Sequence, residues 1–261
     1  MSDSVSPTRV FAAILLRDVT VARRELPFFL VRTTLQPILF VVVFGFLLPR
    51  MGLMQRGYTT MMLPGIVALS LTLSAIQSVA LPMVVEFGRT NEIEDRLLAP
   101  IPTSLVAIEK IVSGMLQGIV AAIFVLPVSR MIMGPMPGLT FGKLPLLLGI
   151  TMLSGAAFAA IGLFLGTAIA PQQIGVVFTV VLAPMIMFGC TYFPWAGLEH
   201  IPVLKWAVLI NPLVYVSEAM RAALTPALPH MPLVALTSAL VVILVLFLWL
   251  GLRAFQRRAV S

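Results

Sequence analysis

Residues that could carry out covalent chemistry are scarce in this chain, and their spacing does not fit a reaction centre. The stretch Gly138 to Lys143 (GLTFGK) approaches a phosphate-binding loop, but it is one residue short, and Leu144 stands where a serine or threonine is required. His200 and His230 lie far apart without a local ligand pattern, and Cys190 is the only cysteine. We therefore expect no catalytic residue, no metal site and no cofactor bound by this chain.

The composition is that of a membrane protein. Apolar residues make up 60% of the chain and charged residues 10%, and the mean hydropathy is +1.07. These values exclude a soluble globular domain and a disordered chain. In a membrane protein the formal charge of +7 indicates orientation and contact with lipid headgroups, so nucleic acid is not an expected partner. The predicted fold is an all-α polytopic membrane protein, with residues 1–261 as a single transmembrane domain.

Six apolar stretches are predicted to cross the bilayer, which takes about 20 residues each. Ahead of them, residues 8–26 have the pattern of an amphipathic helix lying in the membrane interface. Phe11 and Leu15 belong to its apolar face, Arg17 and Arg24 belong to its polar face, and Asp18 lies close to the apolar face without explanation. The six predicted spans cover residues 33–48, 61–85, 105–128, 144–169, 174–191 and 233–252.

Small residues recur at helical spacing in two of these spans. Such faces let helices approach closely, either within one chain or across a dimer, and we favour packing within the chain. They are Gly155, Ala159, Gly162 and Gly166 in the fourth span and Gly114 and Gly118 in the third.

A charged island, Glu86 to Lys110, separates the second and third spans. A charge costs about 2.5 to 3.5 kcal/mol at the centre of a membrane helix, so the island is expected in water or against another protein. Asn91 is a candidate N-cap of a short helix, which Pro100 and Pro102 end. Segment 86–104 is predicted to transmit force from a soluble partner, with a solvated loop as the alternative. The residues expected to act in it are Glu92, Glu94, Asp95, Arg96, Leu97 and Leu98.

Residues 192–232, between the fifth and sixth spans, are predicted to form a re-entrant or interfacial helical hairpin. Its helix-like stretch 213–224 is too short and too charged to span a bilayer, and its tryptophans suit headgroup depth. Glu218 and Arg221 are three residues apart, so they can pair on one face of that helix. The alternative is a surface pair of no measurable energy.

The distribution of lysine and arginine predicts the orientation in the membrane. With both termini in the cytoplasm, eleven of these residues lie on the cytoplasmic side and six lie on the opposite side. The positive-inside rule therefore places the charged island in the cytoplasm and the hairpin outside.

Two stretches together resemble one family, the ABC-2 type ABC transporter permeases. The island sequence TNEIEDRLLAPIPTSLVAIEKI is similar to the cytoplasmic coupling segment of that family, and FPWAGLEHIPVLKWAVLINPLVYVSEAMRAAL is similar to its C-terminal signature. The resemblance covers nearly the whole chain and is nearest to drug-resistance and lipooligosaccharide (nodulation-type) export permeases. It implies that the hairpin closes an extracytoplasmic gate, whose residues would be Phe193, Pro194, Trp206, Asn211, Pro212, Tyr215, Glu218 and Arg221.

The resemblance further implies a half-transporter in a bacterial inner membrane. Two permease copies, expected as a homodimer among membrane lipids, would pair with two copies of a separate ATPase that binds ATP and Mg. This assembly of permease and ATPase would export an amphipathic drug, a lipid-linked molecule, or a glycolipid or polysaccharide. Arg17, Arg24 and the island helix would contact the ATPase.

Two other classes of function stay open. The chain could act alone as an ATP-independent channel or secondary transporter, although no charged residue lies in the middle of a predicted span, as coupled carriers usually require. A membrane-embedded enzyme is disfavoured because no nucleophile, base or metal constellation is present. ATP dependence of transport would separate these hypotheses.

Overall fold

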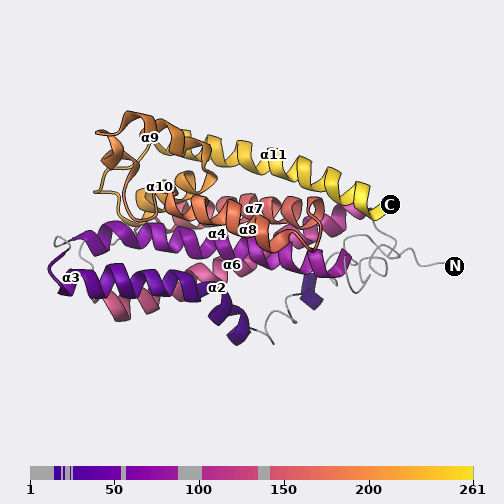
Figure 1. Cartoon of the computed structure of the whole chain (residues 1–261), viewed down its shortest axis with the longest axis horizontal. Helices are drawn as coiled ribbons and strands as arrows, with labels where there is room; N and C mark the ends of the chain where they lie inside the picture. Colours follow the sequence, from indigo (N-terminus) through magenta and orange to yellow (C-terminus); the bar gives the residue numbers. More distant parts are fainter. Residues whose placement is uncertain are drawn as a thin grey trace.

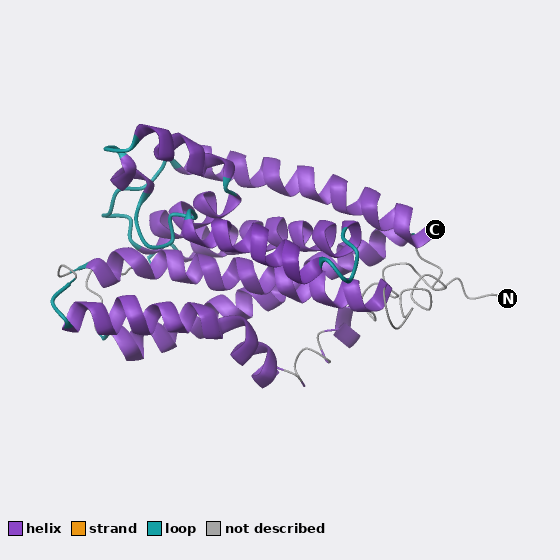
Figure 2. Ribbon diagram, in the orientation of Figure 1, coloured by secondary structure: helices purple, strands orange, loops and turns teal. Residues whose placement is uncertain are grey.

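A computed structural model describes residues 15–18, 20, 24, 26–53, 57–87, 102–134 and 142–260. Every regular element among these residues is helical, which confirms the predicted all-α class (Figure 2). In the described part of the chain, five helices are long and apolar enough to cross a membrane, and the number rises to six if a bent pair of helices counts as one span. The described part of the chain is therefore a multi-pass helical bundle.

The long helices follow the predicted spans, with shifted ends. The first span is continuous from α2 (Leu26–Phe40) through a π-helical segment η1 (Val41–Leu47) into α3 (Leu48–Arg50). The others are α4 (Tyr58–Val85), α6 (Thr103–Met133), α7 (Leu144–Ala168) and α11 (Leu233–Val260). At the predicted fifth span lies α8 (Ile174–Met187), a shorter apolar helix that is not among these five.

Several predicted boundaries were wrong because a helix does not end where the hydrocarbon ends. The first span begins at Leu26 rather than at 33, and α6 and α11 run on into charged residues. Long charged side chains near a helix end reach the interface, so the helix continues past them. In contrast, α8 ends at Met187 rather than at 191, since the chain turns at Gly189 and Cys190, whose φ is 51°.

The helix α4 lies at the centre of the bundle, against α2, α6, α7 and α10 (Figure 1). The small-residue faces of α6 and α7 pack on it directly. A Cβ atom added at Gly162 would lie 2.7 Å from the carbonyl oxygen of Ile76, and one at Gly118 would lie 2.8 Å from that of Leu71. Packing of these faces within the chain, as favoured from the sequence, is therefore confirmed.

The bundle has two distinct ends (Figure 1). At the termini end, the last turns of α4, α7 and α11 meet, because Arg258 Nη1 donates to the carbonyl oxygens of Thr167 (2.9 Å) and Ile169 (3.1 Å), and the ring of Phe87 contacts that of Phe255. At the opposite, hairpin end lie the four short helices η3 (Trp195–Leu198), α9 (Pro202–Ala207), η4 (Val208–Ile210) and α10 (Pro212–Leu224).

A buried ionic cluster closes the termini end. Lys110 Nζ lies 2.9 Å from Glu86 Oε1 and 3.2 Å from Asp18 Oδ2, and Glu109 beside it is fully buried. The expectation that both ends of the charged island lie in water or against another protein was wrong, because helices α4 and α6 bring these residues together inside the chain. The same contacts explain Asp18, which approaches the apolar face because its partner lies there.

The N-terminal residues that the structure describes, 15–18, 20 and 24, are helical. Arg17 and Arg24 are exposed, and Leu15 is half-buried, as the two predicted faces require. A position of this helix in the membrane interface stays a prediction.

Candidate functional site

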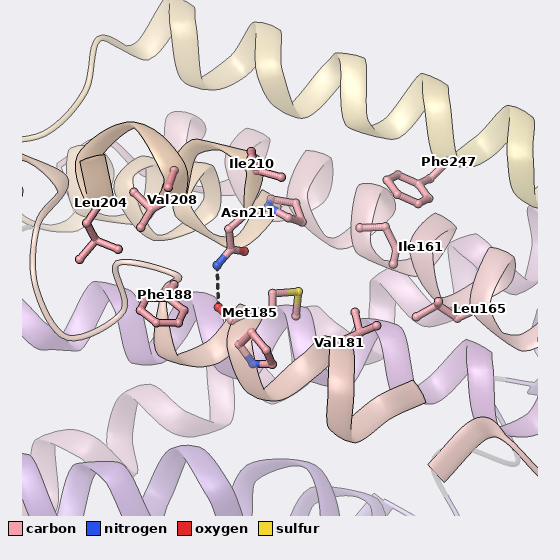
Figure 3. Close-up of a pocket in the computed structure, with 13 residues that line it drawn as sticks. Ile161, Leu165, Val181, Met185, Phe188, Leu204, Val208, Ile210, Asn211 and Phe247 are labelled. Carbon is pink, nitrogen blue, oxygen red and sulfur yellow. Dashed lines mark hydrogen bonds between the residues drawn. The ribbon is translucent and has the colours of Figure 1, made fainter. Parts of the chain in front are cut away.

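The corner of the hairpin is built by Asn211 and Pro212. The side chain of Asn211 caps α10, since its Oδ1 accepts from the N–H of Leu213 at 3.0 Å, and Pro212 occupies the first helical position, where no N–H is needed. Asn211 Nδ2 donates to the carbonyl oxygen of Met185 in α8 at 2.8 Å (Figure 3). The segments before and after this corner, 202–210 and 212–224, are bent by 99°. One asparagine therefore ties the corner to the end of the preceding span.

Glu218 and Arg221 form the polar centre of the hairpin end. They pair through Arg221 Nη1 and Glu218 Oε1, as their spacing predicted, and both side chains are essentially inaccessible to solvent. The alternative of a surface pair was wrong. Glu218 Oε1 also accepts from the backbone N–H of Trp195 (2.9 Å), and its Oε2 accepts from that of Met231 (3.0 Å). One carboxylate thus holds the loop after α8 and the loop before α11 to α10.

Arg221 extends this network to the turn after α8. Its Nη2 donates to the carbonyl oxygen of Cys190 at 3.1 Å, whereas its buried Nε has no hydrogen-bond partner in the described residues. Burial raises the pKa of the Cys190 thiol above its ordinary value, and the charge of Glu218 adds to the rise. The thiol is therefore neutral and shielded at physiological pH.

Aromatic side chains connect the short helices of the hairpin. Trp195 Nε1 donates to the carbonyl oxygen of Lys205 at 2.9 Å, and the Lys205 ammonium lies 4.5 Å from the centre of the Trp195 ring. The Trp206 ring meets Trp195 edge-on and is exposed, and the Tyr215 hydroxyl donates to the carbonyl oxygen of Leu209 at 2.7 Å. These contacts hold η3, α9, η4 and α10 to one another.

The predicted gate residues divide into two groups. Glu218, Arg221, Asn211, Pro212 and Tyr215 lie in or next to the buried core of the hairpin. The exposed Trp206 takes no part in the Glu218 network, while Phe193 and Pro194 are half-buried in the loop that leads to Trp195. The structure thus assembles the whole set at one end of the bundle.

An apolar cavity of about 560 Å³ lies between α7, α8, α11 and the hairpin corner (Figure 3). Side chains such as Ile161, Val181, Phe188 and Phe247 line it, and none of its lining residues is charged. Its main polar side chain, Asn211, is already engaged with Met185 and Leu213. The cavity therefore offers shape and apolar surface, which suits the hydrocarbon part of a ligand.

No group of three histidine, cysteine or acidic side chains that could hold a metal ion occurs in the described ranges. The contacts described above bind and position segments of the chain.

Sequence reasoning missed the partners of Glu218 and the ionic cluster. The two amides that Glu218 binds are backbone groups, which every residue except proline carries, so no side-chain signal marks them. Asp18 and Lys110 are separated by 92 positions, and only the unexplained place of Asp18 on its helix pointed to a partner.

Of the residues predicted to contact a soluble partner, the structure describes two. Arg17 and Arg24 are exposed at their helical positions. The remaining six predicted coupling residues, Glu92, Glu94, Asp95, Arg96, Leu97 and Leu98, lie outside the described residues.

Comparison with known proteins gives a consistent family. A family model described as "ABC-2 type transporter" matches residues 9–225. The chain is 27% identical over 243 residues to proteins named "Inner membrane transport permease YadH" from Escherichia coli K12, Escherichia coli O157:H7 and Shigella flexneri. These alignments cover 87% of this chain and 88% of each relative.

Proposed function

Because the chain belongs to the ABC-2 type transporter family, we propose that it is the membrane-spanning permease subunit of an ABC exporter. Two copies form a homodimer in the bacterial inner membrane and pair with two copies of a separate ATPase, which binds ATP and Mg. The name of its relatives, an inner membrane transport permease, supports the location and the transport role. Both termini and the charged island face the cytoplasm, as the count of lysine and arginine predicts.

The observation that carries the substrate class is the apolar cavity beneath the hairpin corner. It is bounded by the membrane-spanning helices α7 and α11 and by α8, so a molecule can reach it from the bilayer. Its volume lies within the range of about 300 to 1,000 Å³ that accommodates drug-sized ligands. The substrate is therefore amphipathic, as in drug or lipid-linked export, with its hydrocarbon part in the cavity and its polar part toward the hairpin.

The hairpin acts as the extracytoplasmic gate. Its short helices turn back at the Asn211 corner, and the Glu218 network fixes both connections to the spans. Because the network is buried and charged, the hairpin moves as one body rather than residue by residue.

Coupling to ATP hydrolysis runs through the termini end. The charged island and the exposed Arg17 and Arg24 contact the ATPase, and the salt bridges of Lys110 join the N-terminal helix to α4 and α6. A movement of the ATPase is then passed to the central helix of the bundle.

The cavity is tested by filling it. Val181→Trp places a large ring among the cavity-lining side chains of α8, whereas Val176→Trp adds the same ring to an exposed position of the same helix that does not line the cavity. In vesicles containing the permease and its ATPase, Val181→Trp is expected to lower ATP-driven transport of a fluorescent lipid, and Val176→Trp is expected to leave it unchanged. Equal transport by both variants contradicts the substrate site, and transport without ATP favours the channel or secondary transporter.

The coupling segment is tested by charge reversal. Glu94→Lys/Asp95→Lys is expected to insert and dimerise normally but to lose co-purification with the ATPase, because losing a buried interfacial charge pair costs about 2 to 5 kcal/mol. Glu199→Lys, an exposed change at the hairpin end, is the matched control. Normal co-purification and normal substrate-stimulated ATP hydrolysis by the double variant would show that the island is a solvated loop.

A further inference from the structure

A second pocket, distinct from the apolar cavity, lies at the termini end in the groove between α7 and α11. Its volume is about 450 Å³, and its rim carries three arginines, Arg253, Arg257 and Arg258. Its apolar wall is formed by residues such as Phe164 and Leu250. No carboxylate is among the described residues that line it. The pocket thus joins a strongly positive rim to an apolar wall.

The three arginines have different roles. Arg258 is held by the carbonyl oxygens of Thr167 and Ile169, so it closes the end of α7. Arg253 and Arg257 are exposed, and neither makes a salt bridge or a hydrogen bond to another described residue. Arg253 lies 5.2 Å from the centre of the Trp249 ring. Two guanidinium groups are therefore available to an anion from outside.

The depth of the pocket matches the boundary between hydrocarbon and headgroups. Arg253 lies twenty residues after Leu233, which corresponds to about 30 Å along the helix and equals the thickness of the hydrocarbon core. Trp249 lies one turn earlier, at the level where tryptophan is enriched in membrane proteins. Val245, Leu246 and Trp249 are exposed on α11. An apolar strip thus leads from the arginines into the bilayer.

We propose that this groove is a binding site for the phosphate headgroup of an anionic phospholipid. Arg253 and Arg257 bind the phosphate oxygens, a geometry for which guanidinium groups are well suited. The acyl chains lie on the strip formed by Val245, Leu246 and Trp249. Basic pockets between membrane helices at the cytoplasmic surface bind such headgroups, and the orientation proposed above places this pocket there.

A lipid fits the observations better than a soluble protein partner. The pocket lies between two helices, one wall of it is apolar, and an exposed hydrophobic strip adjoins it on α11. A soluble ATPase would contact the ends of the helices, so it would not bury an apolar strip that runs along the side of α11. Free phosphate would use the arginines but not the strip.

The test measures lipid binding to the purified full-length chain by native mass spectrometry. Phosphatidylglycerol is compared with phosphatidylcholine on the wild type, on Arg253→Gln/Arg257→Gln, and on the control Arg130→Gln/Lys143→Gln, which removes two exposed charges at the other end. Each arginine near an anionic headgroup changes affinity about 5-fold, so the first variant is expected to bind phosphatidylglycerol about 25-fold more weakly. The control variant is expected to bind it like the wild type.

Two further measurements test the lipid site without the glutamine variant. Arg253→Lys/Arg257→Lys retains the charge and is expected to retain preference for phosphatidylglycerol. In the wild type, brominated phosphatidylglycerol is expected to quench tryptophan fluorescence more than brominated phosphatidylcholine, and Trp249→Phe is expected to remove the difference.

Four outcomes would overturn the site. An equal loss of affinity in the control variant would show a general effect of net charge, and displacement of the lipid by millimolar inorganic phosphate would show a free-anion site. Unchanged lipid binding together with lost co-purification of the ATPase would assign the arginines to that protein. A quenching difference that survives Trp249→Phe would place the lipid elsewhere.

Discussion

Replacing Glu218 by glutamine preserves its shape and removes its charge. The carboxylate accepts hydrogen bonds from the backbone N–H groups of Trp195 and Met231 and pairs with Arg221. Glutamine has a single acceptor oxygen, so its amide N–H₂ must face a donor whichever way it turns. The least costly orientation keeps the oxygen toward Arg221 and Trp195 and sets the amide against the N–H of Met231.

The expected loss of stability follows from the burial of the Glu218–Arg221 pair. Arg221 would lose its counter-charge while fully buried, and breaking a buried pair in this way costs about 3 to 5 kcal/mol. The lost bond to Met231, about 1.5 to 3 kcal/mol for a charge-assisted bond, overlaps with this figure and is not added to it. The double variant Glu218→Gln/Arg221→Met removes both charges and is expected to be more stable than Glu218→Gln alone, with a coupling energy of about 2 kcal/mol or more.

Two assays measure the effect. Equilibrium unfolding in mixed micelles of graded sodium dodecyl sulfate gives the free energies of the wild type, the two single variants and the double variant. Hydrogen exchange of peptides containing Trp195 and Met231 gives the local effect, and a local loss of about 2 to 3 kcal/mol corresponds to roughly 30- to 150-fold faster exchange. The increase is expected to be larger at Met231.

A destabilisation of less than about 1 kcal/mol by Glu218→Gln, the range of solvent-exposed ion pairs, would contradict a buried, charged pair. Additive costs of the two single variants in the double variant would likewise contradict the pair, since the two charges would then act independently.

Three further predictions rest on other parts of the chain. A cysteine at Met136, in a background without Cys190, is expected to react with an impermeant thiol reagent in intact cells, and one at Asn91 is not; labelling of Asn91 would reverse the orientation. Gly162→Ala is expected to destabilise the protein by about 1 to 3 kcal/mol because its Cβ meets backbone. Gly149→Ala in the same helix meets nothing within 4 Å and is expected to be neutral or stabilising in the same unfolding assay. Cys190 is expected to resist alkylation at pH 8, because burial raises its pKa and keeps thiolate scarce, and rapid alkylation of the folded wild type would contradict that burial.

Local patterns in the sequence predicted much of the fold. The Glu218–Arg221 pair could be predicted because both residues lie on one turn of one helix. The glycine faces could be predicted because their spacing is helical. Long apolar runs located the spans because a bilayer sets their minimum length.

Features that depend on distant contacts were not predictable. The sequence around Lys110 predicts a solvated charge. The carboxylates that neutralise this lysine come from two other helices, so nothing near it in the sequence indicates its burial. The apolar cavity has no signature either, because side chains that line a cavity and side chains that face lipid are of the same types. Phe247 lines the cavity, whereas Trp249, two residues later, is exposed.

The short helix α8 has a consequence for the bilayer around it. Its 14 residues cover about 21 Å, roughly 9 Å less than the hydrocarbon thickness, and only Leu182, Met185 and Ile186 of it are buried. A hydrophobic segment shorter than the membrane is matched by local thinning of the lipid, at a modest free energy for each ångström. A bilayer that matches α8 is therefore thinner beside this helix, and a lipid-like molecule there would have a shorter distance to travel between the two leaflets.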